Sequence, residues 1–523
     1  MKTIIFYALI TCCGWRADAA QIYRFGNSGE PKDLDPQLAA GVPEYQILQN
    51  LYEPLLVLNP KTLKPEPAGA TSWTSSKDGL VWTFNLRKEA KWSNGDAVTA
   101  EDYVYAWRRL LDPALASSYA YFGYFIKNAE AINAGKIGDL KQLGVRAKDA
   151  HTLELTLERP TPYLMKLLYF MSLYPVHQKT VEKFGGNWTH PENTVTNGPY
   201  IMSKWEINKV VALRKNPHYW DQANVKIEGA EIYPIDNTST EEKMFRTGKL
   251  HHTWTVPAEK LDSWRKSKGK EFQSDPMLSV RYLFFNFGKP PMNDSRIRKA
   301  LCLAIDRKQI VDFVTRGNEK PSYSFTPPGA GEFQPKKTFP TDLSRLAEAK
   351  KLIAEAGFKD GKGFPKIELV YNTNDNLKKI LEAAQQMWQK HLGIHITLNN
   401  QEWKSYVAAS RGHEFPMGFG RWEGDYDDPL TFLNLITSTS GSNFALHKNE
   451  KYDKLIELAE KELNNEKRYG FYQQTENIIA EDMPYCPIYV ENRNYLLSPS
   501  VVGWSNNRMG IHPLKGVSLL KGD

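Results

Sequence analysis

The segment 420–429 holds the densest mix of acidic and aromatic side chains in the chain. It reads Gly-Arg-Trp-Glu-Gly-Asp-Tyr-Asp-Asp-Pro, so Asp425 and two further aspartates follow closely after Trp422. Clustered carboxylates can hold a calcium ion or pair with a cationic ligand. An EF-hand loop that began at Asp425 would need a glycine and a bidentate glutamate where Leu430 and Ile436 stand. The segment therefore favours a carboxylate that pairs with a cation.

Catalytic motifs are missing from the sequence. It contains no HExxH, GxSxG, P-loop or CxxC pattern, and Gly329-Ala330-Gly331 lacks the third glycine of a dinucleotide-binding loop. His251 and His252 are adjacent, and adjacent side chains on a strand face opposite ways, which argues against a shared metal ion. We therefore expect a binding protein rather than an enzyme, without a metal or a cofactor.

Residues 70–111 combine a strand, a turn and a capped helix in one unit. Polar and β-branched residues alternate with aromatic and aliphatic ones over 81–87, which predicts a half-buried strand. An Asn-Gly turn follows at 93–96. Thr99 and Asp102 then predict a capping box at the start of a helix.

A second pattern predicts parallel strands. Residues 367–371 and 394–398 have the composition of strands and flank a helical pattern over 377–392 that ends at Gly393, as in a right-handed βαβ unit. Another helix is predicted over 345–356. Strands and helices alternate from end to end, so the fold class is α/β, with interwoven lobes rather than separate beads.

Short motifs extend this pattern along nearly the whole chain. They include Asp33-Leu34-Asp35-Pro36, Tyr52-Glu53-Pro54, Thr196-Asn197-Gly198-Pro199-Tyr200, Lys215-Asn216-Pro217, Lys289-Pro290-Pro291, Ala304-Ile305-Asp306-Arg307 and Gln401-Glu402-Trp403-Lys404. In this order they resemble the extracytoplasmic oligopeptide-binding proteins of bacterial ABC importers. The resemblance implies a two-lobed periplasmic binding protein fold with two crossing segments. It divides the chain into a signal peptide (1–19), lobe I (20–43, 173–278 and 491–523), an inserted domain II (44–172) and lobe III (279–490).

The resemblance also implies a peptide site. Asp425 would pair with the α-ammonium of the ligand and Trp422 would form the wall of a side-chain pocket, as their counterparts do in that family. The ligand would be held as an added strand. Further contacts would come from Glu30, Tyr282 and Asn286 along the peptide backbone and from Tyr119, Tyr121, Trp254 and Trp403 as pocket walls.

The expected site for the ligand's C-terminal carboxylate departs from the family. Basic residues of the broad peptide receptors are matched here by Leu377, Ser410 and Phe419. Arg411 and Arg421 lie beside two of these positions, and Arg316 lies near another, so they are the candidates to replace the missing charge. These changes leave the peptide length, and even peptide as the substrate, open.

The N-terminus has the features of an export signal. Lys2, the apolar run 4–13 and Ala17-Asp18-Ala19 predict a cleaved signal peptide, and the run is too short to span a bilayer. Thr11 precedes Cys12 and Cys12 precedes Cys13 where small residues are usual before a lipid-bearing cysteine, which argues against a lipid anchor. We therefore expect a periplasmic protein.

The charge of the chain and its cysteines bear on its partners and on its covalent bonds. The net charge of +7 is spread along the chain with acids between the basic residues, which argues against nucleic acid as a partner. Cys302 and Cys486 are the cysteines outside the predicted signal. One disulfide is possible after export, but both residues lie in apolar segments, and we expect two buried thiols.

Three classes of function follow from these observations. The first is a monomeric receptor that captures oligopeptides and delivers them to an inner-membrane ABC permease. The second is a receptor for a specialised ligand, such as a murein peptide, an antimicrobial peptide, haem or a metal chelate. The third is an enzyme that acts on peptides.

Overall fold

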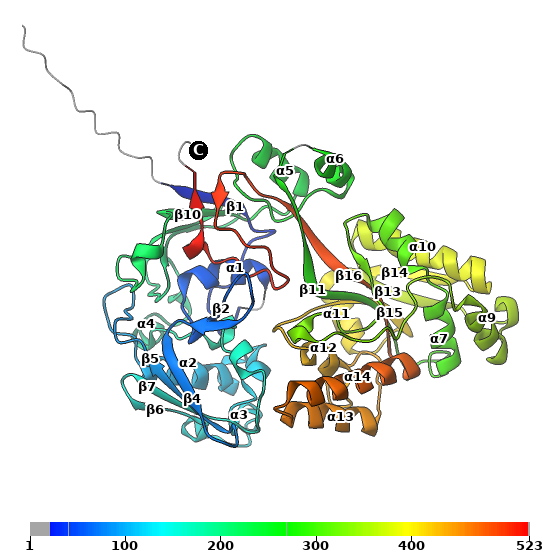
Figure 1. Ribbon diagram of the computed structural model, residues 1–523, viewed down its shortest axis with the longest axis horizontal. Helices are drawn as coiled ribbons and strands as arrows, with labels where there is room; N and C mark the ends of the chain where they lie inside the picture. Colours follow the sequence, from blue (N-terminus) through cyan, green and yellow to red (C-terminus); the bar gives the residue numbers. More distant parts are fainter. Residues whose placement is uncertain (1–20, 40, 268, 521–523) are drawn as a thin grey trace, which may run out of the picture.

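The protein is described by a computed structural model that covers residues 21–39, 41–267 and 269–520. Its elements form two bodies that lie side by side (Figure 1). The body on the left contains the N-terminal sheets, and the body on the right contains the helices α7 to α14. Two long strands run between the bodies.

A four-stranded sheet with the order β1-β10-β9-β8 lies at the top of the first body. β1 pairs in parallel with β10, and the other neighbours are antiparallel. The elements of this region are β1 (Ile22–Gly26), α1 (Val42–Leu51), β8 (Tyr200–Glu206), β9 (Val210–Lys215), β10 (Gly229–Tyr233), α5 (Thr238–Arg246) and α6 (Leu261–Lys266), while α4 (Gln178–Phe184) lies lower in this body, beside α2 (Ala100–Leu111).

A second sheet with the antiparallel order β4-β5-β7-β6 lies below it, together with α2. The predicted capping box is confirmed, because the Asp102 carboxylate accepts the backbone N–H of Thr99 at 2.7 Å. The elements are β2 (Leu56–Leu58), β3 (Pro65–Pro67), β4 (Ala70–Ser75), β5 (Val81–Leu86), α2 (Ala100–Leu111), α3 (Ala129–Asn133), β6 (Val145–Asp149) and β7 (Thr152–Thr156).

Both sheets of the first body share one hydrophobic core. Buried Tyr23 and Phe25 from β1 belong to the same cluster as Phe84 from β5 and Trp107 from α2. The predicted inserted domain 44–172 therefore packs continuously against the predicted lobe I. The boundary between them stays a prediction.

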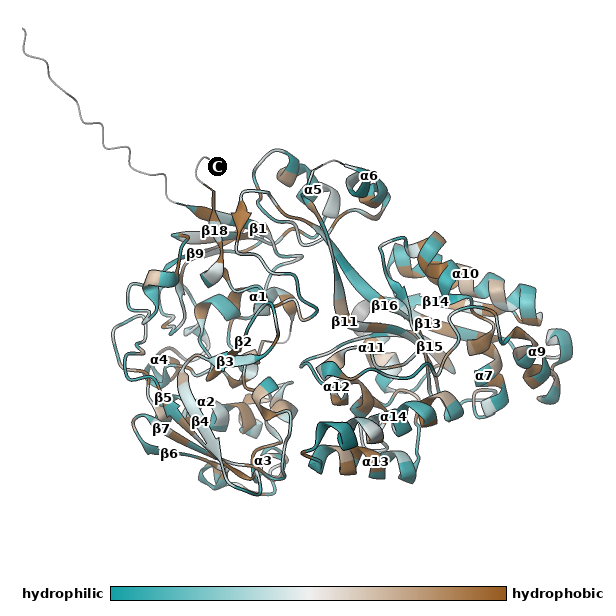
Figure 2. Ribbon diagram, viewed as in Figure 1, coloured by the Kyte–Doolittle hydropathy of each residue, from teal (hydrophilic) through white to brown (hydrophobic). Residues whose placement is uncertain are grey.

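The second body is built on a six-stranded sheet with the order β12-β16-β11-β15-β13-β14. β13 precedes α10 in the sequence and β14 follows it, and the two strands pair in parallel, which confirms the predicted βαβ unit. The hydropathy colouring shows hydrophobic residues recurring between hydrophilic ones along α10 and α7 (Figure 2), as expected for helices with one buried face. The strands are β11 (Phe272–Phe285), β12 (Lys320–Pro321), β13 (Ile367–Asn372), β14 (Ile396–Gln401), β15 (Met417–Glu423) and β16 (Tyr485–Leu496). The helices are α7 (Ser295–Leu303), α8 (Arg307–Gln309), α9 (Leu346–Glu355), α10 (Asp375–Leu392), α11 (Trp403–Arg411), α12 (Leu430–Leu433), α13 (Glu450–Lys461) and α14 (Asn465–Asp482).

The strands β11 and β16 are the two crossing segments. They pair with each other from Phe272 opposite Leu496 to Phe284 opposite Tyr485, and their register shifts between Pro276 and Val280. The chain then returns to the first body, where β17 (Val501–Val502) pairs with β18 (Ser518–Leu519). The predicted two-lobed α/β architecture is thereby confirmed.

The two cysteines of the described chain form a disulfide, so the expectation of two thiols is wrong. Cys302 in α7 and Cys486 in β16 are bonded, with their Cα atoms 5.8 Å apart. Both side chains are fully buried, as the apolar pattern predicted. That pattern reports burial alone, and it contains no information on whether α7 packs against β16.

No helix among the described residues is long and apolar enough to cross a membrane. The predicted signal peptide 1–19 lies outside the described residues, as do Cys12 and Cys13.

Candidate ligand-binding cavity

A cavity of about 280 Å³ lies where the two bodies meet. Its wall combines the N-terminal part of α1, the segment after α2 and the segment around residue 254 with the end of β15. Because these segments belong to both bodies, a ligand in the cavity contacts both. Of the predicted site residues, five line it: Tyr119, Tyr121, Trp254, Trp422 and Asp425.

Asp425 contributes a carboxylate without a protein partner. Its backbone N–H donates to the Thr431 hydroxyl at 3.1 Å, and its carbonyl accepts the Tyr169 hydroxyl at 2.9 Å. Among the described residues, no hydrogen bond or ion pair engages the carboxylate itself. Burial, together with the negative charge of Glu423, raises the pKa of Asp425 to about 7. A cation that entered the cavity would stabilise the ionised form.

Aromatic rings form much of the remaining wall. The rings of Tyr119 and Tyr121 stack with their centroids 5.6 Å apart, and Phe170 lies 5.2 Å from Tyr119. Trp254 is fixed through its backbone N–H, which donates to the Glu241 carboxylate at 2.6 Å. These faces can pack against apolar or aromatic side chains of many shapes.

Two arginines and two glutamates form a charge network beside the cavity. Arg281 pairs with Glu491 at 2.8 Å, and Arg421 pairs with both Glu491 and Glu423, the latter at 2.6 Å. Although burial acts to raise it, the pKa of Glu491 is held well below its usual range by Arg281 and Arg421. The network is therefore neutral in itself, and Arg421, a predicted carboxylate ligand, is already engaged.

Arg493 in β16 is a cavity residue that the sequence analysis missed. Its side chain is buried, donates from Nη2 to Nε2 of His512 at 2.6 Å, and lies with Cζ 5.2 Å from the centre of the Trp254 ring. In the sequence, this strand is indicated only through Cys486 and its apolar segment. Continuing the strand alternation would have placed residues 491 and 493 on one face.

Three predicted contact residues hold the scaffold and do not line the cavity. Glu30 accepts the indole N–H of Trp205 at 2.7 Å. Tyr282 is 1% exposed and stacks on Tyr485 with centroids 4.7 Å apart. Asn286, also 1% exposed, donates to the carbonyl of His413 at 3.0 Å.

The remaining predicted residues also lie apart from the cavity wall. Arg316 is paired with Asp262, and Arg411 is exposed at the last residue of α11. The Trp403 side chain lies outside the described residues, although its backbone begins α11. The three positions at which the resemblance implied basic residues in the family are buried here and hold Leu377, Ser410 and Phe419.

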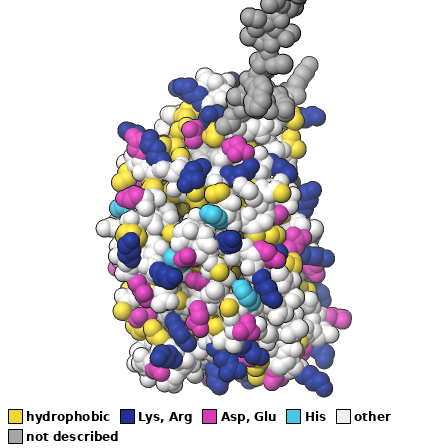
Figure 3. Space-filling view, turned by 90° about the vertical axis from the view of Figure 1, so that its left-hand side faces the viewer, with side chains coloured by type: hydrophobic (Ala, Val, Ile, Leu, Met, Phe, Trp, Pro, Cys, Tyr) yellow, Lys and Arg dark blue, Asp and Glu magenta, His cyan; other side chains and the backbone are white. Residues whose placement is uncertain are grey.

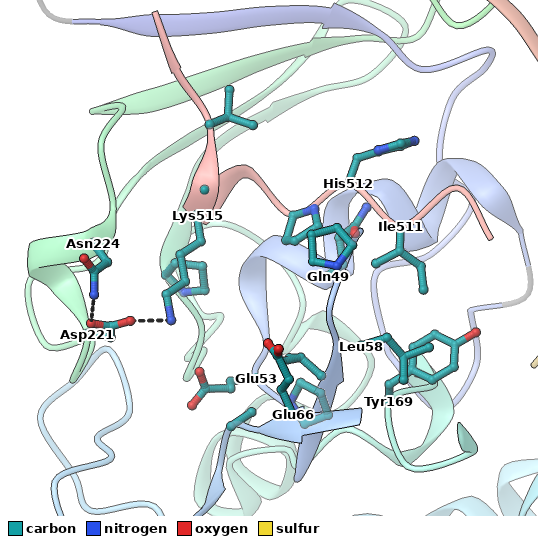
Figure 4. A pocket seen from close by; sticks show the side chains of 18 of the residues that line it. Gln49, Glu53, Leu58, Glu66, Tyr169, Asp221, Asn224, Ile511, His512 and Lys515 are labelled. Carbon is teal, nitrogen blue, oxygen red and sulfur yellow. Dashed lines mark hydrogen bonds and ion pairs between the residues drawn. The ribbon is translucent and has the colours of Figure 1, made fainter. Parts of the chain in front are cut away.

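A larger cavity of about 510 Å³ lies within the first body (Figure 4). Two of the carboxylates that line it are already engaged, since Lys515 bonds Asp221 at 2.5 Å and Trp220 donates to Glu53 at 2.7 Å. Tyr45 and Tyr169 line both cavities and thus stand between them.

The outer surface carries both signs of charge. On the face shown in Figure 3, Lys and Arg side chains are interspersed with Asp and Glu over the whole height of the molecule. Mixed charge of this kind is typical of a solvated surface.

Comparison with known proteins identifies the family. The family of bacterial extracellular solute-binding proteins, family 5, middle region, matches residues 64–444. The periplasmic oligopeptide-binding protein OppA of Salmonella typhimurium is 40% identical over 495 residues, which are 94% of this chain and 90% of that protein. The periplasmic murein peptide-binding protein MppA of Escherichia coli is 37% identical over 483 residues, which are 91% of this chain and 89% of that protein.

Solved structures agree with the sequence matches. The Escherichia coli murein tripeptide-binding protein MppA superposes with a TM-score of 0.85 at 35% identity, covering 96% of this chain and 99% of that one. Haemophilus influenzae OppA in complex with the peptide RPPGFSPFR superposes with a TM-score of 0.83 at 35% identity, covering 96% and 100%. This chain belongs to the family 5 bacterial extracellular solute-binding proteins.

Proposed function

We propose that the protein is a periplasmic receptor that captures oligopeptides in the 280 Å³ cavity and delivers them to an inner-membrane ABC permease. The observation that carries this proposal is the half-buried, unpaired carboxylate of Asp425 in a cavity lined by both bodies. A buried carboxylate is costly unless it is paired, and the α-ammonium is a cation that nearly every peptide offers.

The remaining wall suits a ligand of variable sequence. Tyr119, Tyr121, Trp254 and Trp422 present aromatic surfaces, which pack against side chains without requiring one shape. The peptide backbone would be held by hydrogen bonds in the manner of an added strand. Affinity then comes from groups that all peptides share.

Closure of the two bodies couples capture to delivery. Contacts that join the first body to the second include those of Tyr169 with the carbonyl of Asp425, of Lys166 with the carbonyl of Asp427 at 2.8 Å, and of Arg159 with Glu460 at 3.1 Å. A ligand that touches both bodies adds to these contacts and shifts the population towards the closed form, which the permease would recognise. The receptor acts as a monomer and not as an enzyme.

The direct test is mass spectrometry of ligands released by denaturing receptor purified natively from the periplasm. A ladder of heterogeneous peptides is the expected result. Detection of peptide cleavage products would contradict the proposal. So would a receptor that carries no bound peptide and gives no more heat with added peptides than a titration of the peptides into buffer.

A specialised ligand is the second candidate. Two relatives support it. MppA of Escherichia coli is named as a murein peptide-binding protein. YgiS of Escherichia coli is named as a probable deoxycholate-binding protein and is 37% identical over 92% of this chain and 90% of that protein. In the same mass spectrum this candidate would give one dominant molecular species in place of a ladder.

A further inference from the structure

The charges around the 280 Å³ cavity do not all pair within the protein. Arg281, Arg421, Glu423 and Glu491 neutralise one another through the ion pairs described above. Two cavity residues of opposite charge are left over, Asp425 and Arg493.

Arg493 is buried without a carboxylate partner. Its side chain is 9% exposed, its Nε has no hydrogen-bond partner, and no ion pair of its guanidinium is found among the described residues. The single hydrogen bond found there runs from Nη2 to His512, which burial and the charge of Arg493 keep neutral by lowering its pKa well below the usual range. No carboxylate of the described residues therefore pairs directly with the charge of Arg493.

The local structure holds this charge at the cavity. The guanidinium lies against the ring of Trp254 and beside Gly510, both of which line the cavity. A Cβ at Gly510, whose φ is +63°, would lie 3.1 Å from Nη1 of Arg493. Glycine at this position leaves room for the arginine.

We propose that Arg493 binds a carboxylate of the ligand, so that the receptor prefers peptides that carry an acidic group close to the α-ammonium. A guanidinium binds a carboxylate with charge-assisted hydrogen bonds, and desolvation strengthens them. This inference rests on the proposed function, because it assumes that the α-ammonium occupies Asp425. The acidic group is either a side chain near the N-terminus or the C-terminal carboxylate of a very short peptide.

A purely structural role for Arg493 would involve the carboxylates whose charges act on it, Asp275 and Glu423, and Glu423 is already paired with Arg421. This aspartate lies opposite Arg493 in the pairing of β11 with β16 and interacts with its charge, but it accepts the Tyr495 hydroxyl at 2.8 Å and forms no ion pair within 4.0 Å among the described residues. If Arg493 served only to balance Asp275, its replacement would change stability and leave ligand preference intact.

Calorimetry with matched tripeptide amides separates these roles. The peptides are Ala-Ala-Ala-amide, Gln-Ala-Ala-amide, Glu-Ala-Ala-amide and Ala-Glu-Ala-amide, with Ala-Ala-Ala free acid to test the C-terminal source. Wild type is expected to bind at least one carboxylate-bearing peptide about 10- to 100-fold tighter than its neutral match. The glutamate peptides and the free acid show which source the site prefers.

The variants are Arg493→Gln and Arg493→Lys, with Arg214→Gln, exposed on β9, as the matched control. Arg493→Gln is expected to abolish the preference, Arg493→Lys to retain part of it, and Arg214→Gln to leave it unchanged. Circular dichroism verifies folding. If neither Arg493 variant folds, a second measurement on the wild-type protein replaces the comparison. The protein selects ligands from an equimolar tripeptide library, and mass spectrometry of the bound fraction is expected to show enrichment of peptides that contain Asp or Glu.

An equal preference in Arg493→Gln and wild type overturns the inference, and so does the absence of any preference in wild type. The assignment of the α-ammonium to Asp425, on which the inference rests, fails by a different result, namely equal binding of every peptide and its N-acetylated form. Binding of none of the peptides would overturn the proposed function and the inference together.

Discussion

The Tyr169 hydroxyl donates a hydrogen bond to the backbone carbonyl of Asp425 at 2.9 Å. This bond joins the first body to the segment of the second body that carries the unpaired carboxylate. The same tyrosine lines the cavity, so one side chain both closes the interface and contacts the ligand space. Closure and ligand contact are thereby physically linked.

Tyr169→Phe should weaken peptide binding while leaving the cavity wall in place. Loss of one hydrogen bond costs about 0.5–1.5 kcal/mol, so the affinity should fall by roughly 2- to 10-fold. Isothermal titration calorimetry measures this. Tyr452→Phe is the matched control, because its hydroxyl donates to the Leu433 carbonyl at 2.6 Å within the second body. It should lower stability and spare affinity, and an equal loss of affinity in both variants would contradict the link.

Asp425→Asn should weaken peptide binding by about 2–5 kcal/mol, because the ligand's ammonium would be buried without a counter-charge. N-acetylation of the peptide should weaken binding to wild type and have little effect on the variant. Calorimetry compares the two proteins, wild type and Asp425→Asn, with the two peptides, free and N-acetylated. Thermal unfolding checks that the variant folds. Equal affinity of wild type for a peptide and its acetylated form would remove Asp425 from the ammonium site.

Peptide affinity should fall as the pH is lowered from about 7 to 5. The pKa of Asp425 is raised to about 7 in the empty cavity, whereas a bound ammonium favours its ionised form and lowers the pKa. Binding below pH 7 therefore expels a proton, and the affinity drops by up to about tenfold per pH unit.

Calorimetry in buffers of different ionisation enthalpy reports the proton directly. Release should be seen for wild type between pH 5 and 7 and should disappear in Asp425→Asn. Proton uptake on binding would show that the pKa of Asp425 moves in the opposite direction.

Glu241 should make the protein less stable as the pH rises from about 4.5 to about 7. Burial raises its folded-state pKa from 4.5 to about 7, so the folded state holds a proton that the unfolded chain has released. This group contributes about 2–4 kcal/mol to the free energy of unfolding below pH 4.5, and that contribution is lost as the pH rises to about 7. Urea unfolding of wild type and Glu241→Gln at pH 5 and 8 tests this, and parallel pH dependences would refute it.

Replacing Cys302 and Cys486 together by alanine should lower the free energy of unfolding by about 2–5 kcal/mol. The disulfide closes a sequence separation of 184 residues, so its loss frees the unfolded chain considerably. Peptide affinity should be unchanged, because neither cysteine lines the cavity. Denaturant unfolding with and without reductant provides the measurement, and wild type that is insensitive to reductant under denaturing conditions would argue against the bond.

The sequence by itself determined the features that depend on neighbouring residues. The capping box of Thr99 and Asp102, the βαβ unit around α10 and the acidic segment with Asp425 are each formed within a short stretch of chain. Local hydrogen bonding and side-chain periodicity are expressed in adjacent residue types, so they can be predicted without knowing the fold.

Tertiary structure alone decided which distant groups meet. It placed Arg493 and Trp254 in the same cavity as Asp425, engaged Arg316 with Asp262, and brought Cys302 to Cys486. The partner of a charged group or of a thiol is set by the packing of segments that are far apart in the chain. The residue type shows only that the group is able to form an ion pair or a disulfide. The carboxylate of Asp425 could therefore be predicted as a ligand-binding group, whereas the presence of the unpaired Arg493 in the same cavity could not.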